Sequence, residues 1–388
     1  MSIWLGKGVS MEHSTRTGSG PSSRNAVHIF CACVAVASSA TALFAQESEH
    51  LLSKYRKLDL PEAAGPVPVI YSPGAEERAL RYQKTLAAAV AWFNEQLGTD
   101  IQVALAVADG ETWQRVGDPV PYPMPHSAAA GKPLAGLVAL PARIENFPNL
   151  REFVGDRDPN FMVEAISFHE AGHIFAASLG IWSGNPFVNE LIANVFATGL
   201  IRAGHPQYAF MTAGPPSTFP APRYTSLADL DYLYFAVGMT NFGWFQMKLN
   251  ELSALLLDER EFSGVIEDLK GAFPAAEAQT LPVEKILARI ETLRPGFTTA
   301  AGPLAGPTTL ARTNPTECVT ATPTGGESML VVRNGTNSEL SVKTQAGREA
   351  RIPAGEFRRI GGKTGEQLTL PGGRCLTMSS EPSLATLR

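Results

Sequence analysis

The segment AISFHEAGHIFAASLG, residues 165 to 180, places two histidines and a glutamate in a pattern that otherwise predicts an apolar helix. Residues four positions apart share one face of an α-helix, so His169 and His173 can direct their imidazoles at a single atom. Zinc accepts such nitrogens at about 2.0–2.1 Å. Glu170 can then take a proton from a water on the metal, which produces a nucleophile that attacks a carbonyl.

Chance does not explain this motif, because 7 histidines and 37 acidic residues in 388 predict only about 0.01 matches to H-[DE]-x-x-H. A catalytic zinc needs three protein ligands and one open position. Glu190, in VNELIANVFATGL, is separated from His173 by 16 residues. A turn at Gly180 would fold this second helix back on the first, so we expect Glu190 to be the third ligand of one zinc ion per chain. The alternative is an acid that interacts with the helix dipole.

Asn194 follows Glu190 by one helical turn. A ligating histidine usually makes a hydrogen bond through its other ring nitrogen, which determines its tautomer and orientation. We expect Asn194 to make that bond.

Together, HEAGH and NELIANVFA resemble the gluzincin metallopeptidases, the group that contains thermolysin and the thermolysin-like aminopeptidases. The resemblance covers residues 135 to 250. It implies that His169, His173 and Glu190 are zinc ligands and that Glu170 is the catalytic base. HExxHxxGxxH is absent, as is the aminopeptidase motif GAMEN.

Two departures favour a minor branch of this group. The interval to Glu190 is shorter than in the named families, and Asn194 stands where thermolysin relatives carry an aspartate. Gluzincins also place a Tyr or His across the metal to stabilise the oxyanion. The segment DLDYLYFAVGMTNFGWFQMKLNEL looks like the helix that carries it, which implies Tyr234, with Tyr232 or His205 as alternatives.

In this group, the strand before the active-site helix lies at the sheet edge and pairs with extended substrate. The apolar run 134–140 ends at Pro141, which suits an edge strand or, alternatively, an ordinary internal strand. His126, in the preceding turn-rich segment, is expected to be a loop histidine and could contact substrate.

Hydrophobic periodicity predicts an α+β protein. The resemblance implies a zincin-like catalytic domain, with a small mixed sheet, an active-site helix and a helical subdomain, and we expect a small all-β module after it. Asn160 is the expected N-cap of the active-site helix. The expected strands are 66–73, 101–110 and 134–140, and the expected helices are 74–98, 160–179, 187–201, 227–257 and 282–293.

Composition divides the chain into four parts. Residues 1–45 are typical of a signal peptide, with an apolar stretch from Ala26 and small residues at its end. Residues 46–294 form the expected peptidase domain. Residues 295–316, rich in Pro, Gly and Thr, are the expected linker. Residues 317–388, which alternate β-favouring runs with turn signals, are called the β module below.

The N-terminal segment predicts an exported protein, either periplasmic or extracellular. If the signal is not cleaved, the protein would be membrane-anchored, because its apolar run is close to the ~20 residues of a span; after cleavage, no stable membrane insertion is expected. Signal removal would leave only Cys318 and Cys375, without Cys31 and Cys33. A pair in an oxidising compartment predicts a disulfide.

The expected function is zinc-dependent hydrolysis of a peptide or protein substrate, with Glu170 as general base. The alternative is a catalytically inactive zincin-fold protein whose β module binds a partner. A net charge of −5 without a basic run gives no indication of a nucleic-acid partner.

Overall fold

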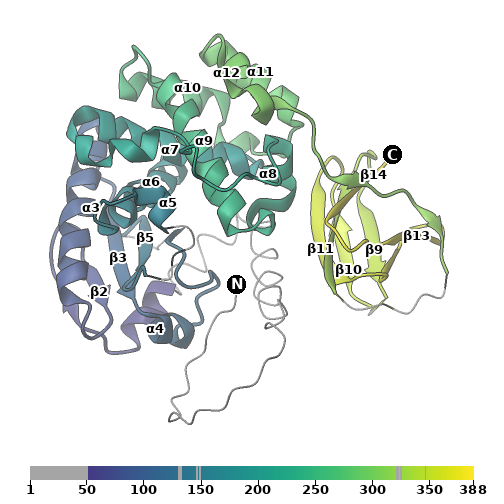
Figure 1. Cartoon of the computed structure of the whole chain (residues 1–388), viewed down its shortest axis with the longest axis horizontal. Helices are drawn as coiled ribbons and strands as arrows, with labels where there is room; N and C mark the ends of the chain where they lie inside the picture. The colour runs from purple at the N-terminus through teal and green to yellow at the C-terminus, as the bar shows by residue number, and fades with distance from the viewer. Residues whose placement is uncertain are drawn as a thin grey trace.

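The computed structural model describes residues 51–388 except 130–132, 146, 148, 149, 320–322, 324, 325 and 346. A larger part combines one sheet with many helices, and strands form the C-terminal part (Figure 1). The predicted α+β class, with a helical part and a C-terminal all-β region, is confirmed. The expected signal peptide, with Cys31 and Cys33, lies outside the described residues.

The sheet of the larger part has the strand order β1-β2-β3-β5-β4. Its three central strands run parallel, while the two outer strands are antiparallel to their neighbours. The central sequences VALAVA and GLVALP are continuous apolar runs because both faces of these strands are buried. The strands are β1 (Glu62–Ala63), β2 (Val69–Tyr71), β3 (Val103–Ala108), β4 (His126–Ala129) and β5 (Gly136–Pro141).

The prediction that the run 134–140 forms an edge strand is wrong. Its strand, β5, pairs with β3 on one side and with β4 on the other. Pro141 is tolerated because it is the last residue of the strand, and the following amide, of Ala142, donates to Ala108. The edge is β4, which carries His126 and comes from the segment that its turn-forming residues had suggested was a loop.

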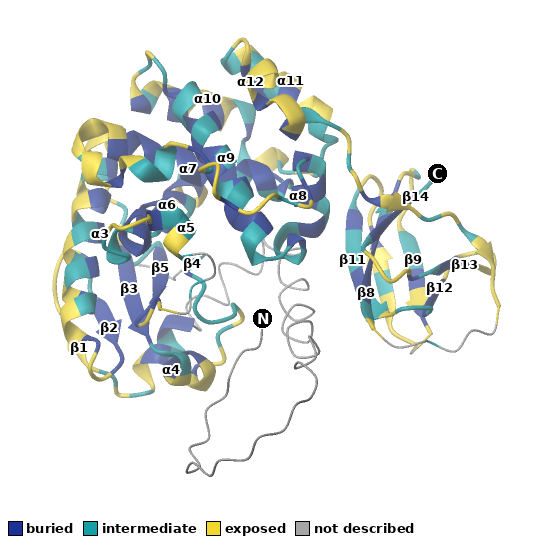
Figure 2. Cartoon of the chain, in the orientation of Figure 1, coloured by how far each residue is buried: buried dark blue, intermediate teal, exposed yellow. Residues whose placement is uncertain are grey.

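Helices α3 (Glu76–Leu97), α6 (Asn160–Ser178) and α7 (Pro186–Gly204) form the core beside this sheet. The buried residues of α6 and α7 lie along most of their length (Figure 2). Gly180 follows α6 with a φ of 75°, which reverses the chain toward α7. The predicted cap of α6 is wrong: Asn160 is its first residue, and its amide donates to the Asp158 carboxylate at 2.9 Å.

The predicted continuous helix 227–257 is also wrong. It is interrupted at Tyr234, with a φ of 50°, and at Gly238, with a φ of 88°. Sequence periodicity also missed α10. The remaining helices are α4 (Gly110–Arg115), α5 (Leu150–Val154), α8 (Leu227–Leu233), α9 (Met239–Leu256), α10 (Phe262–Ala272), α11 (Val283–Leu293) and α12 (Phe297–Ala301), with 3-10 turns η1 (Pro206–Thr212), η2 (Tyr234–Val237), η3 (Ala275–Glu277) and η4 (Gly302–Ala305). Across the described chain, we find no helix that combines the length and the apolar character needed to cross a membrane.

Two sheets, with orders β10-β9-β12-β13-β7 and β11-β8-β14-β6, enclose a separate small core in the C-terminal part. The predicted disulfide between Cys318 and Cys375 is confirmed. The segment 295–316 contains α12, η4, β6 and the start of β7. The strands are β6 (Ala311–Arg312), β7 (Thr316–Glu317), β8 (Glu327–Asn334), β9 (Leu340–Thr344), β10 (Glu349–Ile352), β11 (Phe357–Lys363), β12 (Gln367–Thr369), β13 (Arg374–Thr377) and β14 (Ser383–Leu387).

The β module packs against the helical part through buried apolar side chains. Met329, Val331, Phe357 and Leu384 join the large core rather than the small one. The ring of Phe357 meets that of Tyr232 edge-on, with 5.1 Å between centroids.

Candidate metal centre

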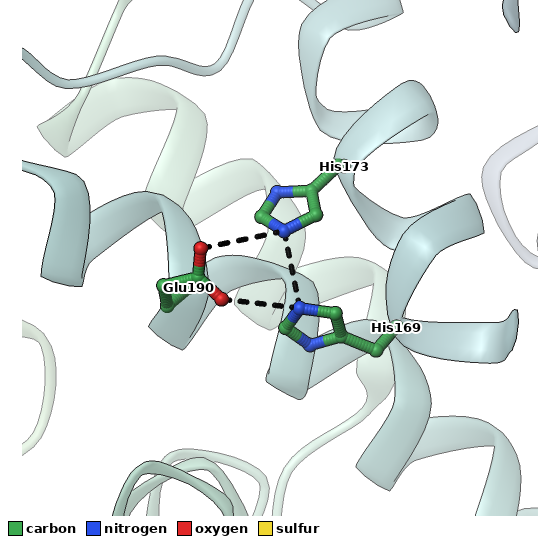
Figure 3. Close-up of side chains that lie close together, drawn as sticks. All are labelled: His169, His173 and Glu190. Carbon is green, nitrogen blue, oxygen red and sulfur yellow. Dashed lines mark hydrogen bonds and ion pairs between the residues drawn. The ribbon is translucent and has the colours of Figure 1, made fainter. Parts of the chain in front are cut away.

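The site is built on two helices that face each other. Helix α6 carries His169 and His173 one turn apart, and α7 directs Glu190 at both imidazoles (Figure 3). The two Nε2 atoms are 3.1 Å apart. The Glu190 carboxylate lies 3.1 Å from the Nε2 of His169 and 3.8 Å from that of His173.

Gly172, inside the HEAGH motif, explains how closely the helices approach. A Cβ at this position would lie 2.8 Å from the Ala193 carbonyl oxygen and 2.8 Å from the Phe196 side chain, both on α7. Any larger residue would therefore push α7 away and move Glu190 from the histidines. A glycine in the middle of a helix is unfavourable for helix stability by itself. The close packing against α7 therefore explains why this position is a glycine.

These three residues fit a zinc ion. Each offers one donor atom, and these atoms all lie within 4.8 Å of one another. Ligand atoms at about 2.0–2.1 Å in a tetrahedral arrangement are about 3.3 Å apart, which the observed separations bracket. Two imidazole nitrogens and a carboxylate oxygen are also a donor set that zinc uses in catalytic sites.

A chain of side-chain hydrogen bonds connects His169 to Glu190. The His169 Nδ1 lies 2.6 Å from the Asn194 Oδ1. Because an amide oxygen can only accept, Nδ1 carries the proton and Nε2 keeps its lone pair for a metal. The Asn194 amide donates to Gln246 at 3.0 Å, and Gln246 donates to the Glu190 Oε2 at 2.6 Å.

Gln246, which lies on α9, was not among the site residues predicted from the sequence. Helical spacing relates residues within one helix or hairpin, whereas Gln246 reaches Glu190 across 56 sequence positions. One signal was present: Gln246 is an uncharged polar residue within the largely apolar stretch FGWFQM. Polar residues on buried helix faces are hydrogen-bonded as a rule, so it required a partner.

The electrostatics of the cluster favour a negative Glu190. Burial alone would raise the pKa of this carboxyl, but the charges and hydrogen bonds of the two histidines hold it well below its usual value. Burial would likewise lower the pKa of His169, and the hydrogen bond to Glu190 reverses that effect and raises it. An anionic carboxylate thus faces both ring nitrogens.

Tyr234 also contacts the cluster. Its hydroxyl donates to the Glu190 Oε1, so both oxygens of this carboxylate have a donor. The positive φ at Tyr234 is rare for a bulky residue, and such conformations concentrate at functional sites. The predicted oxyanion role of Tyr234 stays a prediction, because the hydroxyl is bound to Glu190 here.

Glu170, His169, His173 and Glu190 all line a cavity of about 1020 Å³. Glu170 is 7% exposed and belongs to the buried face of α6. Ser127 and Ala128 of the edge strand β4 line the same cavity. A carboxylate, three side chains that could hold a metal ion and an edge strand therefore meet in one space that is large enough for several residues of a peptide.

Of the other predicted residues, His126 lines this cavity, whereas His205 and Tyr232 are not among the described residues that line it. His205 packs against Phe168 and Tyr208 and is not among the described residues that line this cavity. Tyr232 contacts the β module through its hydroxyl, which accepts from Arg333 at 3.1 Å. His126 lines the cavity from β4, with its Nε2 3.3 Å from the Asp118 carboxylate.

We expect Asn194→Ala to weaken zinc affinity by about 10–100-fold, because His169 would lose the acceptor that orients it. Asn194→Asp keeps an acceptor and should retain the affinity within a few fold. Competition with a chromophoric chelator measures the change. Asn241→Ala is the control, since Asn241 is buried on the same α9 as Gln246 but, among the described residues, its side chain bonds only the Tyr224 backbone. Equal affinities for Asn194→Ala and wild type would contradict the role of Asn194.

No family model matches this sequence, and no curated protein matches it. Among solved structures, the chain is similar to the Legionella pneumophila aminopeptidase A, determined in complex with aspartic acid, with 14% identity and a TM-score of 0.37. The match covers 79% of this chain and 36% of the aminopeptidase, so this chain spans about a third of the length of that protein.

Proposed function

We propose that this chain is a zinc-dependent peptidase of the gluzincin type, with one zinc ion held by His169, His173 and Glu190. One observation carries the proposal: three donor atoms within 4.8 Å of one another face a cavity that also contains the Glu170 carboxylate. A structural zinc site has four protein ligands and needs no base. Three donors and a neighbouring carboxylate favour a hydrolytic centre instead.

Zinc bound here would supply Lewis-acid chemistry, which polarises a carbonyl and lowers the pKa of water. The side chains of the protein would supply proton transfer and the positioning of the ligands. Glu170 is proposed as the general base, which takes the proton of the attacking water on its carboxylate and returns it to the leaving nitrogen. Asn194 and Gln246 are proposed to hold His169 and Glu190 in place through the hydrogen bonds described above.

Strand β4 is the proposed docking edge for substrate. It is the outer strand of its sheet and lines the cavity at Ser127 and Ala128. An extended peptide can add to an open edge through backbone hydrogen bonds, which bind without regard to side chains. This placement replaces the edge strand that the sequence had predicted at 134–140.

We also propose that the protein is exported. The sequence of residues 1–45 and the Cys318–Cys375 disulfide support this proposal, because stable disulfides are typical of oxidising compartments.

Metal removal tests the proposed function. We expect a chelator such as 1,10-phenanthroline to abolish hydrolysis of an unstructured protein such as casein, and one equivalent of zinc per chain to restore it. Elemental analysis before and after dialysis gives the metal content, and circular dichroism shows that the fold persists. Full hydrolysis by metal-free protein would contradict a metallopeptidase, and one bound zinc without hydrolysis would favour the inactive binding protein.

A further inference from the structure

The cavity that is lined by His169, His173 and Glu190 extends to the β module. Strand β11 lies on the side of this module that faces α8 (Figure 1). Five residues from the start of β11 and the turn before it line the cavity: Pro353, Glu356, Phe357, Arg358 and Arg359. The β module thus supplies one wall of the space into which His169, Glu170 and Glu190 also project.

Arg359 is held rigidly in that wall. Its Nε donates to the Tyr232 carbonyl at 2.6 Å, and its Nη2 donates to the Asp231 carbonyl. The guanidinium also lies 5.1 Å from the centroid of the Phe357 ring. These contacts occupy one edge of the planar group, whereas the hydrogens of Nη1, on the other edge, meet no acceptor among the described residues.

The positive charge of Arg359 has no full counterion. None of the described carboxylates forms an ion pair with it. The Asp231 carboxylate accepts instead from the Asn185 amide at 2.5 Å and from the Phe187 backbone at 3.1 Å, and burial raises the pKa of Asp231 to about 7. Glu356, the acid of the same wall, is bound by the Thr280 hydroxyl at 2.8 Å. The cavity therefore contains a fixed, half-buried and incompletely neutralised cation.

Arg359 lines the same cavity as His169, His173 and Glu190. It bonds the carbonyl of Tyr232, two residues before Tyr234, and the Tyr234 hydroxyl donates to Glu190. The cavity reaches all of these groups, so one bound peptide can meet both the cluster and Arg359.

We propose that the β module completes the substrate cleft and that Arg359 binds a carboxylate of the peptide, which makes it a specificity-determining residue. A guanidinium edge with two parallel N–H groups matches a carboxylate, and such charge-assisted bonds are among the strongest that side chains form. The inference rests on the proposed peptidase function. The carboxylate belongs either to the peptide C-terminus or to an Asp or Glu side chain.

Burial lowers the pKa of Arg359 to about 10. The group therefore stays protonated at neutral pH, although its charge is poorly solvated. A carboxylate brought beside it recovers interaction energy that solvent does not provide. Lys54 lines the cavity as well, but it comes from the N-terminal end of the described chain rather than from the β module.

The test uses an acetylated hexapeptide library with randomised central residues, made in four versions. Its C-terminus is an acid or an amide, and its fifth residue is Glu or Gln. We expect wild-type protein to cleave the version with the recognised carboxylate about 10–100-fold faster in kcat/KM than its neutral counterpart, mainly through KM. An acid-over-amide preference identifies the C-terminus, and a Glu-over-Gln preference identifies a side chain.

Arg359→Met should reduce that ratio to about one, and Arg359→Lys should retain part of it. Arg333→Met is the control for docking of the β module, because Arg333 bonds the Tyr232 hydroxyl but does not line this cavity. This variant should retain the full ratio. Equal ratios in wild type and Arg359→Met would overturn the inference, as would equal loss in Arg333→Met and Arg359→Met.

A binding measurement separates this inference from the peptidase proposal. The same four libraries are captured by Glu170→Gln protein, with and without Arg359→Met, and quantified by mass spectrometry. If wild-type protein cleaves nothing but capture prefers the carboxylate in an Arg359-dependent way, the peptidase proposal fails and the carboxylate site stands. Capture without such a preference, or no capture, overturns the carboxylate site whatever the hydrolysis result.

Discussion

Glu170→Gln is expected to lower kcat for peptide hydrolysis by at least about 10³-fold, within the range that a general base contributes, while one zinc ion stays bound. Gln has nearly the shape of Glu, so the packing of α6 should be retained around this buried position. The amide cannot accept the proton of the attacking water. Rates and zinc content, measured on the same preparation, separate loss of the base from loss of the metal.

Glu164→Gln is the matched control for this variant. Glu164 is also a buried acid of α6, but it bonds Arg81 and Tyr208 and does not line the cavity. Its substitution should lower stability while the rate per bound zinc remains near the wild-type value. A Glu170→Gln protein that hydrolyses peptides at the wild-type rate would exclude Glu170 as the base.

Glu190→Ala is expected to lower zinc affinity by at least about 10³-fold, because two histidines alone do not complete the three-ligand set of a catalytic zinc. The loss of zinc affinity should also be seen in the thermal stability of the protein. A ligand present at 1,000 times its Kd stabilises the folded state by about 4 kcal/mol. Zinc should therefore raise the melting temperature of wild-type protein and leave that of the variant unchanged, which calorimetric scans with and without zinc will show.

Two further variants separate loss of a zinc ligand from damage to the fold and from loss of any carboxylate in the cavity. Glu190→Gln keeps an acceptor for Tyr234 or Gln246, so it limits the damage to the metal-free fold while it removes the anionic ligand. Glu356→Gln changes a carboxylate in the far wall of the same cavity and should leave zinc affinity unchanged. Undiminished zinc binding by both Glu190 variants would show that Glu190 is not a ligand.

The sequence predicted the residues of the cluster because their relationship is local. Helical spacing brings His169 and His173 together, and a short turn returns the chain so that Glu190 and Asn194 approach them. Gly172 is visible in the sequence, but its role in the close packing of α6 against α7 becomes clear only from the structure. A glycine at that place in an apolar helix is a signal of close packing.

The parts that the sequence did not predict depend on distant contacts. The order of β3, β5 and β4 follows from which strands pair, and a Pro at the end of a run does not distinguish an edge from an interior strand. The break at Tyr234 opposes the helical pattern around it and is maintained by tertiary contacts, including the bond to Glu190. Arg359 lines the cavity only because the β module packs against the helical part of the chain.

The three proposed ligands belong to a single helical hairpin, residues 169 to 190, whereas Arg359 joins the cavity from the last tenth of the chain. Contacts that are close in sequence cost little loop-closure entropy and form early, and the N-terminal part of a chain emerges first from the ribosome. The hairpin can therefore assemble while the β module is still being synthesised. If the hairpin binds zinc at that stage, the proposed hydrolytic centre forms before the proposed carboxylate site, and a chain truncated before the β module is expected to be less selective.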